Sequence, residues 1–224
     1  MKLTALACIV LLCSYFDSNY TPPGTLKVNN LYIDKTEILN IHWLEYVHFR
    51  NSFLDDIDLD SISTKEMLPD SGNFWYAYPQ FYNHPVTGIT YEQAVDYCKW
   101  RSGMVRRKWH KKVTYRLPTI QEWKAIADYE YSRHGDKLEA NMLDAQRIIS
   151  SDSSGYVILF DCTDPKNEIY HLFDNVSEMT AEKGIAMGSN NFELVPVKQN
   201  LTRKIKYSAP NSYLGFRCIA VIEK

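Results

Sequence analysis

The most constraining feature of this chain is the string YRLPTIQEWKAIA at residues 115–127. Thr119 and Glu122 have the T-x-x-E spacing of a capping box, in which each side chain binds a backbone N–H of the first helical turn. Pro118 lies just before that turn and restricts the preceding residue to an extended conformation. The sequence therefore predicts an extended segment that turns into an amphipathic helix, and only Arg116 is left unexplained by local rules.

A second capping box has the same spacing. Thr90 and Gln93 predict the start of another helix, within residues 88–107. Before it, residues 29–39 alternate between apolar and polar side chains and are rich in β-formers, which is typical of a strand. Asn40 can then cap a helix formed by the string IHWLEYVHF.

The second half of the chain has less periodicity. The basic stretch 106–112 is predicted to be a solvated connection, and residues 132–168 are turn-like apart from a short strand at 155–160. Further short strands are expected at 184–189 and within 213–222. Helices come early and short strands come late, which favours an α+β fold over alternating βαβ units.

The N-terminus has the order of an export signal. One lysine is followed by an apolar run from Leu3 to Phe16, shorter than the ~18 residues that would span a bilayer. We expect residues 1–18 to be an export signal, the alternative being a buried N-terminal strand or helix. Cys13 could be a lipid-attachment site, although Leu12 before it is bulkier than the small residue usual there.

Composition excludes some classes of function. The chain has 224 residues, which suits one large domain, and a formal net charge of -2, which gives no support for nucleic-acid binding. No G-x-S-x-G elbow of a serine hydrolase is present. In an oxidising compartment the body of the chain, with Cys98, Cys162 and Cys218, allows one disulfide and one free thiol, without deciding which two residues pair.

Several strings, in order along the chain, resemble motifs of the sulfatase-modifying-factor family, which includes the formylglycine-generating enzymes. They are YIDKTEILN (32–40), HPVTGITYEQAVDYCKW (84–100), YRLPTIQEWKAIA (115–127), NEIYHLFDNVSEMT (167–180), AMGSNNF (186–192) and YLGFRCIA (213–220). The resemblance implies a single compact α+β domain over residues 22–222. Its fold would be a variant of the C-type-lectin-like fold, with short helices, short antiparallel strands and long irregular loops.

The resemblance also assigns structural roles. Arg116 would be a buried or half-buried hydrogen-bond hub for the surrounding loops, with the carboxylate of Glu37 or Glu122 as partner. Family members pair the cysteines that match Cys98 and Cys218, so a disulfide is expected there. Cys162 then remains as a small buried apolar residue.

The chemistry of the family's enzymes finds few matching residues here. Formylglycine-generating enzymes bind copper through two cysteines between the motifs that match Gly188 and Arg217, and this interval contains no cysteine. Because copper(I) needs a soft thiolate ligand, we reject the oxidase function. The six histidines do not match the triad of the iron-dependent members, and none are spaced i,i+4. The string APN at 209–211 lacks the carboxylate that calcium-dependent sugar binding would need.

Structural calcium is the inorganic ligand that the resemblance still allows. Calcium takes six to eight oxygen ligands. His171 stands where an oxygen-bearing side chain is usual, and the alternative is a hydrogen-bonded loop without metal. The expected ligands are the Glu178 carboxylate with the backbone carbonyls of Asp174 and Val176, and Asn141 at the other site.

The resemblance favours a non-catalytic protein of the bacterial envelope that binds a protein partner, similar to lipoproteins of gliding-motility and secretion machinery. It would be exported to the periplasm or outer membrane, and an N-terminal lipid would hold it at the membrane. Residues 51–74 are polar and predicted to be a surface excursion, and 51–83, with the aromatic string NFWYAYPQFYN (73–83), is the expected contact surface. The alternatives are a metal-dependent enzyme with an unidentified site and an accessory subunit or chaperone.

Overall fold

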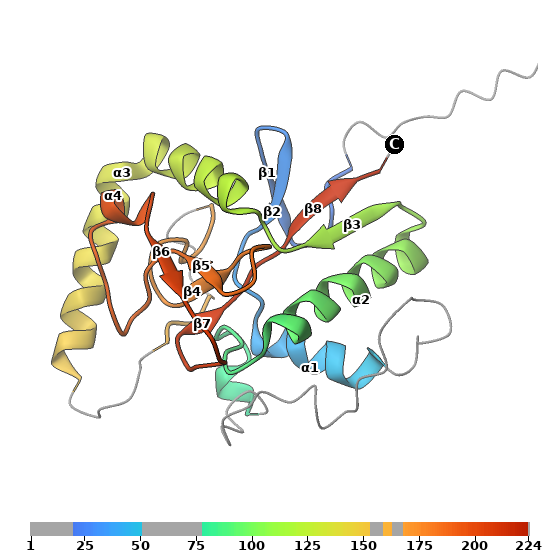
Figure 1. Ribbon diagram of the computed structural model, residues 1–224, viewed down its shortest axis with the longest axis horizontal. Helices are drawn as coiled ribbons and strands as arrows, with labels where there is room; N and C mark the ends of the chain where they lie inside the picture. The colour runs from blue at the N-terminus through green and yellow to red at the C-terminus, as the bar shows by residue number, and fades with distance from the viewer. Residues whose placement is uncertain (1–19, 51–77, 153–158, 163–167, 224) are drawn as a thin grey trace, which may run out of the picture.

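The first sheet joins the two ends of the domain. The computed structural model describes residues 20–50, 78–152, 159–162 and 168–223 (Figure 1). A two-residue turn, with Asn29 at φ 53°, joins β1 (Thr25–Val28) and β2 (Leu31–Asp34) into a hairpin. The sequence predicted the second strand of this hairpin but not the first. The antiparallel strands follow the order β1-β2-β8-β3, and they are β1 (Thr25–Val28), β2 (Leu31–Asp34), β3 (Val113–Arg116) and β8 (Ile219–Ile222).

The second sheet is smaller and has the order β6-β5-β4-β7. Strand β4 pairs with β5 antiparallel but with β7 parallel, so the expectation of antiparallel strands holds only in part. Residues 213–222 form two strands, because the chain leaves one sheet at β7 and enters the other at β8. The strands are β4 (Ser177–Met179), β5 (Ile185–Met187), β6 (Lys204–Lys206) and β7 (Leu214–Gly215).

Both predicted capping boxes are present. Helix α2 (Tyr91–Trp109) begins where Thr90 Oγ1 accepts a hydrogen bond from the Gln93 backbone N–H at 3.1 Å. Helix α1 (Asn40–Phe49) begins one residue earlier than expected, with Leu39 at the N-cap position. The Asn40 side chain instead donates to the carbonyl of Phe81 at 2.9 Å, which ties α1 to the short 3₁₀ helix η4 (Pro79–Phe81).

Helix α3 (Ile120–Ser151) is much longer than the sequence suggested. Its capping box matches the prediction, since Glu122 Oε2 accepts from the Thr119 N–H at 2.9 Å. The prediction of turn-like structure from residue 132 onward was wrong, because the helix kinks at His134 (φ -135°, ψ 16°) and then continues. Its second half has an apolar stripe that packs on the domain, made of Leu138, Met142 and Ala145.

The first sheet buries its two faces against different helices. Tyr115 and Ala220 contribute to a core with α1 and α2, centred on the aromatic rings of Trp43, Tyr46, Tyr97, Trp100 and Phe216. Ile33 and Ile219 point to the opposite face and pack with Trp123 of α3. Figure 1 shows α1 and α2 together beside β3 and α3 on the other side of the molecule, next to the second sheet and α4 (Val197–Asn200).

Some sequence predictions lie outside the described residues. These are the export signal at 1–18 with Cys13, most of the expected contact surface (51–77), and all but the last two residues of the strand expected at 155–160. Residues 159 and 160 are not in a strand. Among the helices of the described part, none is both long and apolar enough to cross a bilayer.

Candidate functional site

A buried cluster of charges lies where the two sheets meet. The guanidinium of Arg217 is fully buried, and its Nε lies 2.6 Å from Glu178 Oε1. Its other nitrogens donate to the backbone carbonyl of Asp34 at 3.2 Å and to that of Tyr170 at 2.8 Å. Arg217 thus connects β4, β2 and the loop before β4, a use that suits the planar fork of arginine.

The acidic side of this cluster also has its hydrogen bonds satisfied. Trp123 Nε1 donates to the second oxygen of Glu178 at 2.9 Å. Glu37 accepts from Asn175 Nδ2 at 3.1 Å and lies 4.0 Å from the Arg217 guanidinium. Burial raises the pKa of Glu178 to about 7, against the opposing effect of Arg217. These contacts give each carboxylate oxygen of Glu178 a hydrogen-bond partner within the domain.

Arg217 is a hub that was not predicted, and it is more deeply buried than Arg116, for which that role was expected. Arg116 is half-buried as expected and binds Glu122, one of its two expected partners, through two hydrogen bonds of 2.8 and 2.7 Å. It also donates to the backbone carbonyl of Leu117 at 3.2 Å. Glu37 belongs to the Arg217 cluster instead. The reason is position, because Arg116 ends β3 immediately before α3 and its side chain reaches the first turn of that helix.

The body cysteines are all buried. Cys98 Sγ and Cys218 Sγ lie 3.1 Å apart, so the structure brings together the two residues that the resemblance pairs. Both are thiols here, and a covalent bond between them remains a prediction. The thiol of Cys162 donates to Glu37 at 3.4 Å. Burial raises the pKa of Cys162 far above its usual range, which favours the protonated thiol over the nucleophilic thiolate.

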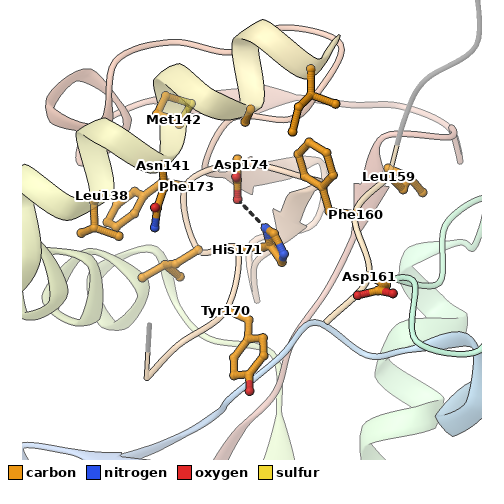
Figure 2. Close-up of a pocket in the computed structure, with 13 residues that line it drawn as sticks. Leu138, Asn141, Met142, Leu159, Phe160, Asp161, Tyr170, His171, Phe173 and Asp174 are labelled. Carbon is orange, nitrogen blue, oxygen red and sulfur yellow. Dashed lines mark hydrogen bonds and ion pairs between the residues drawn. The ribbon is translucent and has the colours of Figure 1, made fainter. Parts of the chain in front are cut away.

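A pocket of about 360 Å³ lies between the second half of α3 and two loops (Figure 2). One wall is a stripe of α3 with helical spacing, made of Leu138, Asn141, Met142, Ala145 and Ile148. The opposite wall comes from residues 159–161 and 170–174. The lining is largely apolar, as in many small-molecule sites, and its polar groups converge on the 170–174 loop.

An ion pair lies inside this pocket. His171 Nδ1 is 2.8 Å from Asp174 Oδ1, and the ring also hydrogen-bonds the backbone of Asp161. Burial lowers the pKa of His171, but the carboxylates of Asp174 and Glu37 and the bond to Asp161 outweigh it and raise the pKa to about 9. The ring is therefore an imidazolium at neutral pH, already engaged by two acceptors.

The aromatic wall of the pocket is fixed from behind. Asn175 Oδ1 accepts from the backbone N–H of Phe160 at 2.8 Å, and Asn175 Nδ2 lies 3.2 Å from the Phe160 carbonyl. The Phe160 ring stacks on His171, with centroids 5.8 Å apart. Because Nδ2 of Asn175 also donates to Glu37, the wall is tied directly to the buried charge cluster.

The calcium ligands were predicted for two sites, Glu178 with the carbonyls of Asp174 and Val176 at one and Asn141 at the other, and calcium binding stays a prediction. Asn141 and Asp174 line the pocket, whereas Val176 and Glu178 do not. Both oxygens of Glu178 accept from nitrogen donors, and within the described ranges no three His, Cys, Asp or Glu side chains gather as metal ligands do. Calcium needs six to eight oxygens, and here the cations Arg217 and His171 lie beside the acidic groups.

One more buried acid was missed by sequence reasoning. Glu130 is 1% exposed, and neither of its carboxylate oxygens has a hydrogen-bond partner among the described residues. His134 lies one turn later, at the kink of α3, and its buried Nε2 also lacks a hydrogen-bond partner among the described residues. Burial raises the pKa of Glu130. The i,i+4 spacing of Glu130 and His134 was the sequence signal that could have indicated that these two side chains lie side by side on a helix.

Comparison with known proteins places the chain in a family. The sequence profile of the sulfatase-modifying factor enzyme 1-like domain matches residues 12–222. The chain belongs to this family. The resemblance drawn from the motifs is therefore confirmed, and the single α+β domain agrees with the relation of this family's fold to the C-type-lectin-like fold.

Solved structures and curated proteins provide two further comparisons. Among solved structures, PvdO from Pseudomonas aeruginosa matches this family member with a TM-score of 0.45 and 13% sequence identity. The match covers 85% of this chain and 80% of PvdO. No curated protein matches the chain in sequence.

Proposed function

We propose that this sulfatase-modifying-factor domain is non-catalytic, is exported, and binds a protein partner in the bacterial envelope. The enzymes that the chain resembles place their copper-binding cysteines between the motifs that match Gly188 and Arg217. The chain has no cysteine in this interval. Without a thiolate, copper(I) has no soft ligand there, so the scaffold would be kept for binding.

An aromatic pair in the same interval, the exposed Phe192 and the half-buried Tyr213, carries the proposal. Phe192 is 71% exposed, more than any other large hydrophobic side chain in the described part of the chain. Its ring stacks on Tyr213, with centroids 5.3 Å apart and an angle of 13° between the planes. Aromatic side chains, phenylalanine and tyrosine among them, are enriched at protein interfaces relative to the rest of the surface.

Short hydrogen-bonded turns hold both rings in place. Asn190 Oδ1 accepts from the backbone N–H of Phe192 at 3.0 Å, and Asn211 Oδ1 accepts from that of Tyr213 at 3.1 Å. Arg203 pairs with Glu193 at 2.6 Å beside Phe192. A partner would therefore meet a surface that is already ordered, which reduces the entropy lost on binding.

The contact surface expected at 51–83 is less well supported. Within its described part Tyr78 is 54% exposed. However, the Phe81 carbonyl accepts from Asn40, and the carbonyl of Asn83 accepts from the backbone N–H of Cys162 at 3.0 Å. The backbone carbonyls of Phe81 and Asn83 are thus engaged within their own domain, and the Phe192–Tyr213 pair is the interface candidate that lies wholly among the described residues.

The test is capture of a partner from envelope extract with the full chain and two matched variants. Phe192→Ala should lower recovery of a specific partner at least about tenfold, as expected for a hot spot. Trp109→Ala removes another exposed aromatic ring, 50% exposed at the end of α2, and should leave recovery unchanged. Equal recovery by Phe192→Ala and the unaltered chain would contradict the proposed interface.

Export has its own test, because the partner-binding proposal depends on the compartment. Mass spectrometry of the mature N-terminus should show loss of the first residues, and a lipid on Cys13 if the chain is a lipoprotein. A mature chain that still begins at Met1 would contradict export. The same spectrum, with and without reductant, would reveal a Cys98–Cys218 disulfide.

A further inference from the structure

The pocket beside α3 is rich in hydrogen-bond acceptors. Its charged lining consists of Asp161, His171 and Asp174, with no lysine or arginine among the described residues that line it. The His171 ring is already engaged by Asp174 and by the backbone of Asp161. The Asp174 carboxylate faces His171 through Oδ1, and Asn141 lines the same pocket from α3 with an amide oxygen that can accept a hydrogen bond.

The remaining walls also suit a cation attached to an apolar body. Phe160 and Phe173 bring aromatic rings to the pocket, and such rings attract cations through their faces. Leu138, Met142 and Ala145 supply an aliphatic wall from α3. In Figure 2, Asn141, Phe160 and Asp174 surround the same space above His171. The pocket volume of about 360 Å³ lies within the range of small-molecule sites.

We propose that this pocket binds an organic amine, with the ammonium group on Asp174 and the apolar body against α3. Asp174 would accept a charge-assisted hydrogen bond from the ammonium, and Asn141 would accept another through its amide oxygen. The amine could be a small molecule or the lysine side chain of a partner. The pocket lies in a different part of the chain from the Phe192–Tyr213 pair, so this proposal does not depend on that interface.

Calorimetric titration of the full chain with two ligands of matched shape tests the charge preference. Tryptamine and indole-3-propionate have the same apolar body and opposite charge. We expect tryptamine to bind at least about tenfold more tightly, because the acid lacks the charge-assisted hydrogen bond to Asp174. Equal affinity for the two ligands, or no saturable binding of tryptamine, would overturn the proposal.

Two variants with the same substitution locate the site. Ala145→Phe places a ring in the pocket and should abolish tryptamine binding, whereas Ala140→Phe adds the same ring at an exposed position of α3 and should not change it. Asp174→Asn should remove the preference for the amine. If Asp174→Asn does not fold, Ala145→Phe still tests whether the amine binds in this pocket. Unchanged tryptamine binding by Ala145→Phe would overturn the assignment.

A third arm distinguishes the two sources of the amine. The capped peptide acetyl-Leu-Lys-Leu-amide and its counterpart with norleucine in place of lysine differ by the ammonium group. Binding of the lysine peptide at least as tightly as tryptamine would support a partner's side chain as the occupant. Binding of tryptamine alone would support a small amine. This titration uses no cellular partner, so its failure is distinct from failure of partner capture.

Discussion

The two halves of the domain use buried charge in different ways. In the α1/α2 half, formed by α1, α2 and the aromatic core around Trp43, the buried charges are paired: Arg50 lies 2.6 Å from Asp96, and Arg101 lies 2.7 Å from Asp34. In the α3 half, formed by α3 and the loops it contacts, His171 pairs with Asp174 at 2.8 Å, but Glu130 is buried without a hydrogen-bond partner among the described residues. The pocket lies in this second half.

Packing differs in the same way. Rings in the α1/α2 half contact one another closely, as between Trp43 and Tyr46 with centroids 4.8 Å apart. In the α3 half the helix kinks at His134, and its stripe faces a pocket where a close-packed core would have side chains. Close packing resists any change of shape, while a half with spare volume can admit a ligand. We infer that one half maintains the scaffold and the other carries binding capacity.

The largest effect on stability is expected when one partner of a buried ion pair is removed. Arg50→Leu leaves Asp96 buried with the Tyr46 hydroxyl as its remaining side-chain partner among the described residues, and should lower the free energy of unfolding by about 3–5 kcal/mol. Arg133→Leu in the α3 half removes an exposed pair, with Glu168 at 3.9 Å, and should change it by less than about 1 kcal/mol. Urea unfolding measures both. Similar losses in the two variants would contradict the contrast between the halves.

A second effect is tied to pH. Because the pKa of His171 is raised in the folded state, its pairing stabilises the fold fully below the unfolded pKa of about 6.5. That contribution, on the order of 3 kcal/mol, should be lost as the pH rises through about 9.

His171→Asn removes this titration and should flatten the dependence of unfolding free energy on pH between 7 and 10. Unfolding in urea at both pH values gives the comparison. A variant that loses as much stability as the unaltered chain over this interval would show that another group causes the pH dependence.

The same substitution in the two halves should have opposite results. Ala94→Leu in the close-packed half should destabilise the fold by about 1–3 kcal/mol, because no space is available for the larger side chain. Ala145→Leu fills part of the pocket and should be neutral or stabilising by up to about 2 kcal/mol. Thermal unfolding of the two variants measures both changes. Equal destabilisation by Ala94→Leu and Ala145→Leu would mean that the pocket is not open space.

The smallest effect concerns the unpaired acid. The pKa of Glu130 is raised by burial, and of the charged groups that act on it Glu168 raises it further while His134, Arg133 and Arg217 lower it. An acid with a raised pKa destabilises the fold only above its unfolded pKa of about 4.3.

Glu130→Gln should therefore raise the unfolding free energy by about 1 kcal/mol at pH 7 and leave it unchanged at pH 4. Denaturant unfolding at the two pH values measures this. Destabilisation at pH 7 would instead indicate that Glu130 has a polar partner, such as an ordered water, that the amide cannot serve.

Local chemistry made the helix starts predictable from sequence, and long-range contacts made other features unpredictable. Thr90 with Gln93 and Thr119 with Glu122 define their helices within one turn, so both were found. The continuation of α3 past His134 depends on the apolar stripe that begins at Leu138, which packs against residues far along the chain.

The site was harder to predict for the same reason. Arg217 contacts Asp34 and Glu178, which are distant in sequence, so its role as hub could not be read from spacing. The motif match identified the family, because the motifs are local strings. It did not indicate that His171 would form an ion pair within a pocket, since that depends on how α3 folds back over the loop.

The most direct measurement is an assay for the reaction that this scaffold catalyses in related enzymes. The full chain would be supplied with one equivalent of copper(I) and a cysteine-containing peptide, and the peptide would be analysed for an aldehyde by mass spectrometry after hydrazide coupling. We expect no aldehyde and no stoichiometric copper binding, because no thiolate lies between Gly188 and Arg217. Conversion of the peptide cysteine to an aldehyde would show that the domain is an enzyme after all.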